Sequence, residues 1–567
     1  MMNRFGLPGG RRRYLLAAGS LVLAFVNITG ALLKLAPARH SIVRAMLGGS
    51  APGAPRFLLL LAGLLLIAAI PGLVRAKRMA FAITFSAALT SVALHPLRVR
   101  DPDDAGALIA LAVTIGLATS FRLFPARSDP LRIRQGLWWL IGGEAFVFLM
   151  GFVGLYFVDR EVVEPMDAPE ALSNAFRLLF VLPTTTIPES GHVQRLIEAI
   201  RGLSLVVLAI SAWHLVHPVL NRRFARPSER EHVKGILSLH ATTALAPFHL
   251  LDDKTYAFSN DGQAFLSFRM VGSTAVVLGE PVGPAESATN AAREFIEMCS
   301  LNGWRFGFHQ VTGAGADALT AMGLKKIKIG EEAIIPIQTF SLAGKSFKHL
   351  RNIQHSLERD GFVVEELPQP LDGAVLDELQ AVSDAWMAAD GHRERTFTLG
   401  QFDRDYLRET RVFVVWRKGG RIEAFANVVA RYRSADATFD LMRRRPDSPN
   451  GVMDLLLLHF IELFRADGCD GLNLGLAPLA NVDEPGPKGA ALRLMYERGN
   501  VAFNFRGLRS YKDKWNPIWF DRYLVYRSDV DLVPVALAVA RVGEKQGLVA
   551  RFAHASLGRA RRRQKPA

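Results

Sequence analysis

The sequence predicts a multi-span α-helical membrane domain followed by an α/β half in which one structural unit is used twice. At 567 residues, the chain exceeds the size at which a single hydrophobic core stops growing, so more than one domain is expected. Long apolar runs fill the first 225 residues, whereas short strand patterns alternate with amphipathic helices after residue 234. The order hairpin, strand, glycine loop, helix, strand occurs twice in this later part.

Charge and composition narrow the classes of function. Half of the residues are apolar, and 68 Lys and Arg residues outnumber 53 Asp and Glu residues, which gives a formal net charge of +15. A chain that is both hydrophobic and basic indicates a membrane or a polyanion as partner, or both. Cys299 and Cys469 lie far apart in the sequence, so we expect reduced core thiols rather than a disulfide or metal ligands.

Six apolar runs have about the length needed to cross a bilayer, roughly 20 residues. They are residues 14–36, 57–75, 79–96, 105–124, 137–158 and 201–220. Basic residues concentrate in alternate connecting segments, beginning with Arg11, so the positive-inside rule places the N-terminus and the α/β half in the cytoplasm. The apolar segment from Ala171 to Leu182 is short and contains Arg177, so we expect an interfacial or re-entrant piece there.

Two ionisable residues lie within these runs, Glu144 in the fifth and His214 in the sixth. An ionisable group at membrane depth is a functional candidate. An interhelical hydrogen bond inside a packed bundle is the alternative, and the sequence leaves both open.

The first α/β block follows a basic linker, Asn221 to Lys234. Its turn Asn260-Asp261-Gly262 lies between β-rich runs and predicts a hairpin. The predicted elements are strands at 256–259, 263–270 and 273–278, a loop at 279–283, a helix at 285–301 and a strand at 304–311.

The second block repeats this order, with strands at 412–416, 422–431 and 437–442, a helix from Met453 and a strand at 471–475. The order resembles that of acyltransferases of the GNAT superfamily, so the sequence predicts tandem GNAT-like domains. Acetyl-CoA users of that superfamily carry an Arg/Gln-x-x-Gly-x-Gly/Ala pattern before the central helix. Here Gly451 is followed by Val452 and Met453, and the first loop ends in Gly283-Pro284. This departure argues against coenzyme A as the donor.

The stretch 439–480 combines a strand, an arginine-rich turn and the start of a helix. Asp440 lies in the strand, three arginines begin at Arg443, and Asp454 lies in the first turn of the helix. The first turn of a helix presents unpaired N–H groups and the positive end of the helix dipole. The sequence therefore predicts an anion site at this loop.

A second basic segment, residues 345–361, lies between the two blocks. Leu350, Ile353 and Leu357 stand at helical spacing and predict an amphipathic helix. A basic stripe lies beside them, formed by Lys345, Lys348, Arg351 and His355. A solvated helix face is the alternative to a binding surface.

Seven motifs then occur in a recognisable order. They are Gly279-Glu-Pro-Val-Gly283, Lys348-x-x-Arg351-Asn352, Phe397-Thr-Leu-Gly-Gln-Phe-Asp403, Asp440-Leu-Met-Arg443, Pro449-Asn-Gly451-x-Met453-Asp454, Leu474-Gly-Leu-Ala-Pro478-Leu and Leu508-Arg509-x-Tyr511-Lys512-x-Lys514-Trp515-x-Pro517-x-Trp519. Together they resemble the phosphatidylglycerol lysyltransferase family, the multiple peptide resistance factors. The likeness covers about residues 235–527.

The resemblance implies a multi-pass enzyme of the inner (cytoplasmic) membrane with a cytoplasmic catalytic domain. Such an enzyme moves an amino acid from aminoacyl-tRNA to the glycerol head group of phosphatidylglycerol. Lysine is the expected amino acid, with alanine and arginine as alternatives, because relatives use all three. A lysyl group would make the lipid more positive, so the cell surface would repel cationic antimicrobial peptides. Longer members carry extra N-terminal spans that act as a flippase, and the six spans here resemble the synthase-side set alone.

The expected domains follow from the motifs and the apolar runs. They are a transmembrane domain at 1–225, a first GNAT-like domain at 226–345, a second, catalytic GNAT-like domain at 346–527 and a basic C-terminal tail at 528–567. The expected partners are aminoacyl-tRNA, phosphatidylglycerol and the membrane, and a homo-oligomer remains open.

The aminoacyl ester of tRNA is already activated, so its exchange for another ester requires neither ATP nor a metal, and no cofactor is expected. The site must instead supply positive charge, positioning and help in moving a proton. Asp440 and Asp454 are expected to act in acid–base chemistry or to orient a hydroxyl, with binding of the substrate amino group as the alternative for Asp454. Arg443 is expected to hold a phosphate. The expected substrate-binding residues are Lys345, Lys348, Arg351, Asn352, Asn450, Gly451, Arg509, Tyr511, Lys512 and Lys514.

Two other functions are compatible with the sequence. One is a lipid flippase or transporter whose soluble half is regulatory. The other is tRNA-dependent aminoacyl transfer to an acceptor other than phosphatidylglycerol.

Overall fold

The computed structural model describes most of the chain. The described residues are 8–32, 54–95, 105–126, 130–157, 167–179, 191–215, 225–389, 394–417, 419–478, 482, 486, 489 and 505–543. The chain divides into two compact units, Met1–Leu220 with Met298–Trp304 and Asn221–Glu297 with Arg305–Ala567. Of the predicted basic tail, the part after residue 543 lies outside the described residues.

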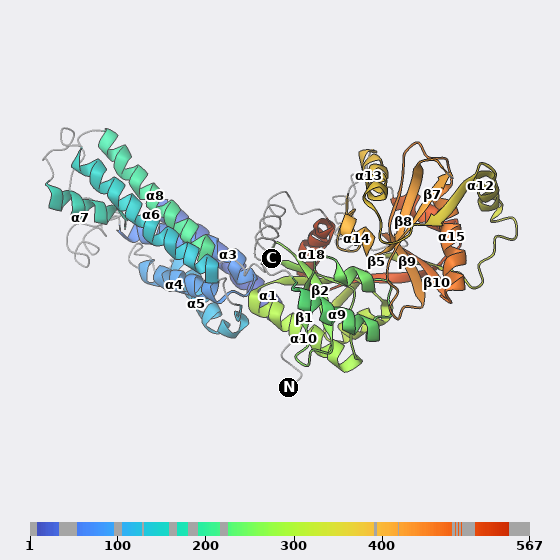
Figure 1. Ribbon diagram of the computed structural model, residues 1–567. Helices are drawn as coiled ribbons and strands as arrows, with labels where there is room; N and C mark the ends of the chain where they lie inside the picture. Colours follow the sequence, from blue (N-terminus) through green and yellow to red (C-terminus); the bar gives the residue numbers. More distant parts are fainter. Residues whose placement is uncertain are drawn as a thin grey trace. The chain divides into compact units, whose positions relative to one another are not determined.

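The first unit is helical (Figure 1). Its elements are α1 (Pro8–Leu32), α3 (Ala54–Val74), α4 (Arg78–Leu94), α5 (Ala105–Ala118), the 3-10 turn η2 (Phe121–Leu123), α6 (Pro130–Tyr156), α7 (Ala168–Leu179) and α8 (Gly191–Leu215). Six of these helices fall on the six predicted apolar runs, and α7 falls on the predicted interfacial segment. Buried side chains of α1, α3, α4 and α5 form one core, and those of α6, α7 and α8 form another.

Length and hydropathy together mark fewer candidate spans among the described residues than the sequence predicts. Among the described residues, Arg12–Ala31 and Arg134–Tyr156 are long and apolar enough to cross a membrane, by length and composition alone. The apolar stretches Arg78–Leu94 and Ala105–Ala118 are shorter than the roughly 20 residues that a bilayer requires, and α3, which has 21 residues, contributes the apolar stretch Leu58–Val74. Two of the six predicted spans are thus supported by this criterion, and the other four stay predictions.

Polar side chains inside the helical unit have partners on other helices. Asn27 of α1 donates a hydrogen bond to Ser91 of α4 at 2.7 Å, and its Oδ1 lies 3.0 Å from His95 Nε2. The Ser204 hydroxyl of α8 donates to the Glu144 carboxylate of α6 at 3.0 Å. This contact favours the bundle-packing alternative for Glu144.

The second unit is built on one 11-stranded sheet, in the order β1-β2-β3-β4-β11-β5-β10-β9-β8-β7-β6. The β3–β4 and β9–β10 pairs are parallel, and the other pairs are antiparallel. The strands are β1 (Thr255–Phe258), β2 (Phe265–Val271), β3 (Thr274–Leu278), β4 (Arg305–Val311), β5 (Lys325–Pro336), β6 (Phe362–Glu366), β7 (Arg411–Arg417), β8 (Ile422–Val428), β9 (Asp436–Arg444), β10 (Gly471–Pro478) and β11 (Ile518–Tyr526).

Helices cover both faces of this sheet (Figure 1). They are α9 (Pro227–His240), the 3-10 turn η3 (Ala246–Leu250), α10 (Ala285–Asn302), α11 (Gly313–Ala321), α12 (Lys348–Arg359), α13 (Gly373–Ala388), α14 (Arg404–Arg408), α15 (Val452–Ala466), α17 (Phe505–Asp513) and α18 (Asp529–Val542). The predicted strands and the two predicted central helices are confirmed, with ends that agree within about three residues. The predicted repeat is confirmed in element order, as β1-β2-β3-α10-β4 and β7-β8-β9-α15-β10.

Strand exchange joins the two halves of the α/β unit. β5 follows the first repeat in sequence, but it pairs with β10 and β11 of the second half. β11 in turn lies between β4 and β5, with Leu524 opposite His309 and also opposite Ile327. The halves predicted at 226–345 and 346–527 therefore share one sheet, and their boundary stays a prediction from the sequence.

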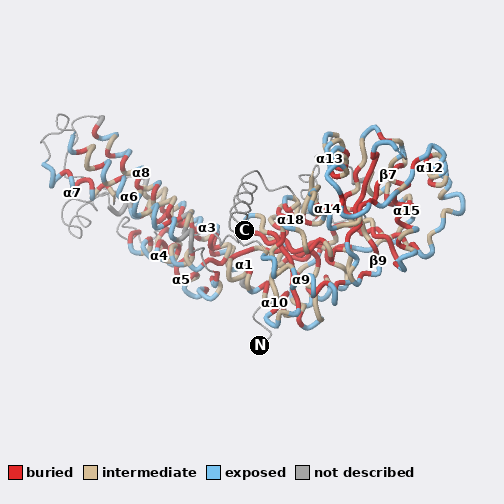
Figure 2. The backbone as a smooth tube through the Cα atoms, in the orientation of Figure 1, coloured by how far each residue is buried: buried red, intermediate tan, exposed pale blue. Residues whose placement is uncertain are grey.

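Side-chain alternation explains why strands of the second half are buried on both faces. In β7, Val412 and Val414 pack with α13, whereas Phe413 and Val415 pack with α15 and α12. Period-two alternation sends neighbouring residues to opposite faces, so an apolar run is expected where helices cover both. Figure 2 shows these strands as buried and the outer helix faces as exposed. Cys299 and Cys469 are buried thiols, which confirms the predicted core thiols.

Helix α12 packs over the start of α15 at Gly451. Gly451 is the N-cap of α15 and has a left-handed backbone with φ of 92°. A Cβ atom at this position would lie 2.4 Å from Ile353 Cγ2 of α12. Glycine is therefore required twice, by the backbone conformation and by the packing.

We predict that Gly451→Ala destabilises the chain more than Gly468→Ala does. Gly468 also has a positive φ, of 71°, but a Cβ there would meet nothing within 4 Å. The control should lose about 1 kcal/mol from backbone strain, and Gly451→Ala a further 1–3 kcal/mol from overpacking. Unfolding of the full chain in detergent measures both. Equal losses would contradict the packing argument, and Ile353→Ala should restore the excess.

Candidate functional site

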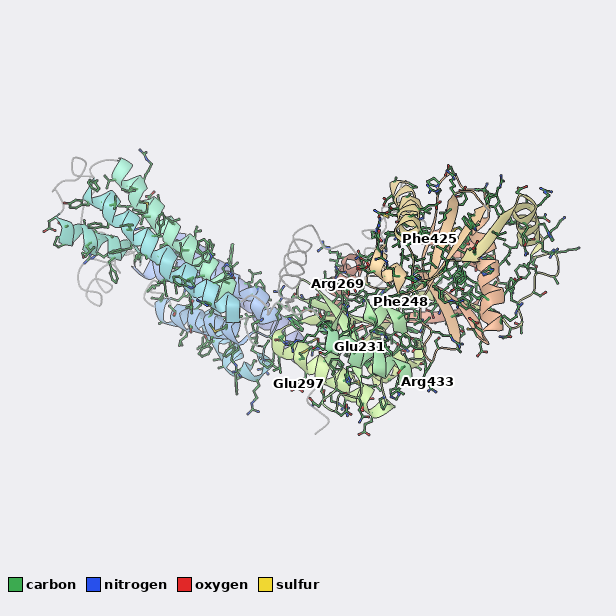
Figure 3. The ribbon with its side chains drawn as sticks, viewed as in Figure 1. Glu231, Phe248, Arg269, Glu297, Phe425 and Arg433 are labelled. Carbon is green, nitrogen blue, oxygen red and sulfur yellow. The ribbon has the colours of Figure 1, made fainter. Side chains whose placement is uncertain are left out.

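A cavity of about 1000 Å³ lies between the two halves of the α/β unit. The first half contributes Leu245, Phe248, His309 and Gln310, and Figure 3 labels Phe248. The second half contributes the loop from Glu394 to Leu399 and residues of β9, β10 and α17. The C-terminal helix α18 closes one side through its last residues. The cavity is thus assembled from segments far apart in the sequence.

Asp440 of β9 lines this cavity and is 7% exposed. The backbone N–H of Gly400 donates to its two carboxylate oxygens at 2.9 and 2.8 Å, and the Tyr406 hydroxyl donates to Oδ2 at 2.7 Å. Burial raises the pKa of Asp440 to about 6, although these hydrogen bonds act in the opposite direction. The carboxylate is therefore held in one orientation and titrates near neutral pH.

Gly400 is needed for this arrangement. A Cβ atom at position 400 would lie 2.1 Å from Asp440 Oδ2 and 2.7 Å from the ring of Tyr406. The close backbone approach thus depends on the absence of a side chain. Gly400 was not among the predicted site residues, although the motif from Phe397 to Asp403 contains it.

Arg443 does not line the cavity. Its guanidinium is buried, donates to Glu394 at 2.7 Å and to the Ser383 hydroxyl, and lies 5.1 Å from the centre of the Trp386 ring. Glu394, by contrast, lines the cavity. Arg443 therefore lies behind Glu394 as seen from the cavity, and its guanidinium already donates hydrogen bonds to protein groups. This geometry does not favour the predicted phosphate contact.

Lys512 of α17 lines the cavity and is 5% exposed. Its Nζ donates to the carbonyl oxygens of Gly475 at 2.8 Å and Leu476 at 2.9 Å. These carbonyls belong to an irregularity in β10, where the pairing with β5 shifts between Asn473 and Leu476. Burial lowers the pKa of Lys512 to about 7, although attraction by the nearby Glu332 carboxylate acts in the opposite direction.

Tyr511 also lines the cavity, and Asp454 and Lys514 lie behind it. Asp454 of α15 is buried and forms an ion pair with Lys514. Lys514 Nζ lies 3.9 Å from the centre of the Tyr511 ring. The fold therefore brings Asp454 and Lys514 next to Tyr511, but of these three residues Tyr511 alone lines the cavity.

Arg509 lies in a separate cluster. It donates to Glu331 at 2.6 Å, and its guanidinium stacks over Trp519 at 4.2 Å from the ring centre. It does not line the cavity.

The predicted residues of α12 lie on the surface instead. Lys345, Lys348 and Asn352 are exposed, and Arg351 donates to the Leu342 and Gly344 carbonyls, to the latter at 2.7 Å. Asn450 is exposed beside them, at the position preceding Gly451. Because Ile353 packs on Gly451, α12 covers the loop at which the sequence predicts an anion site.

Several cavity residues were missed by sequence reasoning. His309 of β4 is 7% exposed, and its Nδ1 has no hydrogen-bond partner among the described residues. Burial lowers the pKa of His309 to about 4, so the ring is neutral at physiological pH. Gln310 beside it has a positive φ of 63°, which is rare outside glycine and asparagine. Both residues lie within a predicted strand, and a strand pattern does not show which of its polar side chains line a cavity. Glu394 and Asp384 lay in segments without any motif.

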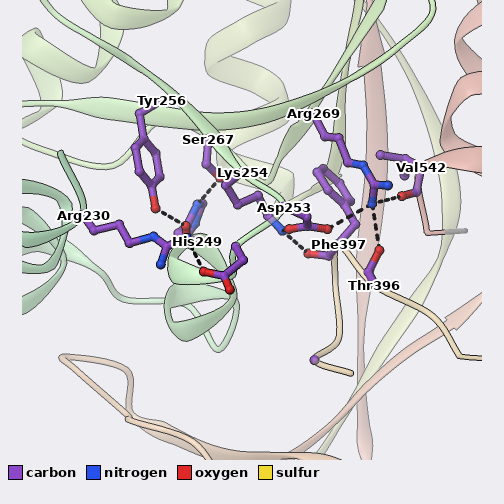
Figure 4. A network of polar contacts seen from close by, with 12 residues as sticks. Arg230, His249, Asp253, Lys254, Tyr256, Ser267, Arg269, Thr396, Phe397 and Val542 are labelled. Atoms are coloured by element: carbon purple, nitrogen blue, oxygen red, sulfur yellow. Dashed lines mark hydrogen bonds and ion pairs between the residues drawn. The ribbon is translucent and has the colours of Figure 1, made fainter. Parts of the chain in front are cut away.

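A buried network holds the loop that carries Thr396 and Phe397 (Figure 4). Lys254 is buried, forms an ion pair with Asp253 and donates to the Phe397 carbonyl at 2.8 Å. Arg269 donates to Asp253 at 3.2 Å and to the Thr396 hydroxyl at 2.8 Å. Burial lowers the pKa of Lys254 to about 8.

The same network reaches the C-terminal helix. Arg269 donates to the Val542 carbonyl at 2.8 Å, and the Thr396 N–H donates to the Gly543 carbonyl at 3.0 Å. Phe397 is fully buried with a positive φ of 79°, a strained conformation for an aromatic residue. Groups of the first half and of α18 therefore fix the loop that carries Gly400 to Asp440.

No metal site is evident in the part of the chain that the structure describes, since no three His, Cys, Asp or Glu side chains are grouped to hold an ion. The cavity instead carries carboxylates, Lys512, Arg395 and one neutral histidine. Such a set can orient an amine or a hydroxyl and can move a proton.

Comparison with known proteins identifies the family. The family described as phosphatidylglycerol lysyltransferase, C-terminal, matches residues 234–526. The phosphatidylglycerol lysyltransferase of Bacillus subtilis is 31% identical over 345 residues, which cover 60% of this chain and 40% of that protein. That of Staphylococcus haemolyticus is 30% identical, with 60% and 40% covered. The matched part of the chain thus spans about 40% of the length of these curated relatives.

Two solved structures are also similar. L-PGS from Bacillus licheniformis is 32% identical with a TM-score of 0.51, over 55% of this chain and 95% of that chain. The C-terminal domain of a putative lysylphosphatidylglycerol synthetase from Agrobacterium fabrum is 31% identical with a TM-score of 0.51, over 57% and 98%. Since the family match covers more than half of the 567 residues, the chain belongs to the phosphatidylglycerol lysyltransferase family through its α/β unit.

Proposed function

We propose that the protein transfers an aminoacyl group from aminoacyl-tRNA to the glycerol head group of phosphatidylglycerol, at the cytoplasmic face of the inner membrane. The observation that carries this proposal is the cavity shared by both halves, in which Asp440 and Lys512 are buried and already oriented. Family membership supports the lipid acceptor, because the curated relatives are named for it.

The cavity supports ester exchange chemically. The aminoacyl ester of tRNA is already activated, so the protein needs to position the two substrates and to manage one proton. Asp440 would accept a hydrogen bond from the glycerol hydroxyl while Gly400 and Tyr406 keep its carboxylate fixed. His309 offers an unused ring nitrogen for a further substrate contact.

We propose lysine as the transferred amino acid, with arginine as the cationic alternative, because of the acidic residues in the cavity. Asp384, Glu394 and Asp440 all line it, and a cationic side chain would gain favourable interactions with these acidic groups. In this proposal Arg443 holds Glu394 in place rather than contacting a phosphate. Asp454 likewise positions Lys514 and Tyr511 instead of contacting the ester.

The exposed basic residues are proposed to bind the tRNA. Lys345 and Lys348 are exposed on and beside α12, where they can reach phosphates. The helical unit would anchor the enzyme beside its lipid substrate, with Arg12–Ala31 and Arg134–Tyr156 as its strongest candidate spans. A multi-pass topology with a cytoplasmic α/β unit is part of the same proposal.

The decisive experiment uses membranes that contain the full chain, labelled aminoacyl-tRNA and phosphatidylglycerol. Label should move into lipid from lysyl-tRNA, and RNase treatment should prevent it. A panel of alanyl-, arginyl- and lysyl-tRNA identifies the amino acid. Transfer into a different product would indicate another acceptor. An absence of transfer with every charged tRNA would overturn the enzymatic proposal and favour a transport function.

We predict that Asp440→Asn lowers the transfer rate by about 10²-fold or more, because a neutral amide binds and orients the glycerol hydroxyl more weakly than a carboxylate does. Asp436→Asn is the matched control, since Asp436 lies on the same strand but does not line the cavity. The control should retain a rate near that of the wild type. A wild-type rate in Asp440→Asn, measured as lipid-bound label, would remove Asp440 from the site.

Asp440 should also affect stability as a function of pH. Its pKa is raised in the folded state, so the folded chain binds more protons than the unfolded chain between about pH 4 and pH 6. Its contribution to stability is therefore present below this window and is lost as the pH rises through it. Unfolding temperatures of wild type and Asp440→Asn should show a shallower decline for the variant. Parallel curves would contradict the raised pKa.

Binding of tRNA should weaken steeply as salt increases, because phosphate contacts release counterions. Replacing Lys345 or Lys348 with Ala should reduce the slope of log affinity against log salt by about 1 each. Lys326→Ala serves as the control, because this exposed lysine of β5 is paired with Asp317 and lies outside the basic segment 345–361. Filter binding of tRNA to the detergent-solubilised chain measures the slopes. A flat salt response would exclude these lysines from the tRNA surface.

A further inference from the structure

Lys512 differs from the other basic residues around the site. Lys345 and Lys348 are exposed, and Lys514 is paired with Asp454, whereas Lys512 is buried and lines the cavity. Among the described residues, no carboxylate lies within ion-pair distance of its Nζ. A buried cationic group without a counter-ion is expensive, so this lysine has reason to lose its proton.

The hydrogen bonds of Lys512 are compatible with a neutral amine. A neutral amine has two N–H bonds and one lone pair, whereas an ammonium group has three N–H donors. Gly475 and Leu476 provide two carbonyl acceptors, at 2.8 and 2.9 Å. Both hydrogens of the neutral amine are therefore satisfied by β10, and its lone pair remains for the cavity that Lys512 lines.

The charged groups around Lys512 do not offset the effect of burial on its pKa. Glu332 of β5 raises its pKa by attraction, but this carboxylate is itself paired with the buried Arg522 of β11. Burial is the larger effect, and the resulting pKa is about 7. The other titratable or charged groups that line the cavity are His309, Asp384, Glu394, Arg395, Asp440 and Tyr511.

We propose that Lys512 is the catalytic base of the transfer, and this inference rests on the proposed function. The glycerol hydroxyl gives its proton to the neutral Nζ while its oxygen forms a bond to the acyl carbon. The acyl oxygen carries the negative charge until the bond from the acyl carbon to the ribose oxygen breaks. The ammonium of Lys512 then returns the proton to that ribose oxygen, so the amine is regenerated and no other reactant is consumed.

Chemical rescue tests this role with the full chain, lysyl-tRNA and phosphatidylglycerol vesicles. Lys512→Ala should lower the turnover number about 10²-fold or more while the KM for lysyl-tRNA stays unchanged. Added methylamine or ethylamine should restore lipid product in proportion to the free amine present. Tetramethylammonium, which carries charge but has no proton to exchange, should restore nothing.

Two further variants separate a base from a positive charge. Lys512→Arg keeps a cation that does not lose its proton at neutral pH, so it should remain as slow as Lys512→Ala. Lys325→Ala is the matched control, because Lys325 is half-exposed, pairs with Asp529 and lies outside the cavity. It should retain the wild-type rate. Wild-type turnover in Lys512→Arg would overturn the proposal and assign Lys512 to charge stabilisation.

The pH dependence gives an independent measurement if Lys512→Ala does not fold. Wild-type turnover should fall as pH drops through about 7, as the amine becomes protonated, and this limb should be missing from Lys512→Arg. The same limb in both proteins, or a folded Lys512→Ala that amines do not rescue, would overturn the role of Lys512 alone. A wild-type chain without transfer would instead overturn the proposed function.

Discussion

The cavity depends on the buried cluster formed by Asp253, Lys254 and Arg269. These three residues belong to the first half of the sheet, yet they hold Thr396 and Phe397 of the second half. Removing one member of a buried charge cluster leaves an uncompensated charge, which typically costs about 3–5 kcal/mol. The cluster can therefore maintain the strained backbone of Phe397, which costs about 1–3 kcal/mol. The Gly400 N–H that orients Asp440 follows three residues later.

The cavity is lined mostly by apolar side chains and carries polar groups at a few points. Asp440 and His309 come from opposite halves of the sheet, and Lys512 comes from a helix near the C-terminus. Burial disfavours the charged form of all three groups, so it raises the pKa of Asp440 and lowers the pKa values of His309 and Lys512. One physical effect thus yields a carboxyl group that titrates near 6, a neutral imidazole and an amine that titrates near 7.

Local signals in the sequence predicted the elements well. The turn at Gly262 between two β-rich runs indicated the hairpin and its strands, and both were found. The motifs also placed Asp440, Tyr511 and Lys512 in the site, and these three do line the cavity. Arg443 shows the limit of such reasoning. Its type and spacing fit a phosphate contact, but the orientation of its side chain is set by Glu394, which lies in a segment without a motif.

The sequence did not predict which strands pair when they lie far apart in the chain. Periodicity identifies a strand but not its neighbours, so the two halves read as separate domains, whereas β11 is inserted between β4 and β5. Until residue 526 has been synthesised, the edges of β4 and β5 that face β11 have no partner strand, although β10 can already pair with the other edge of β5. Open edges invite pairing with other chains. The newly made chain is therefore most exposed to misassembly in the interval before its last strand emerges from the ribosome.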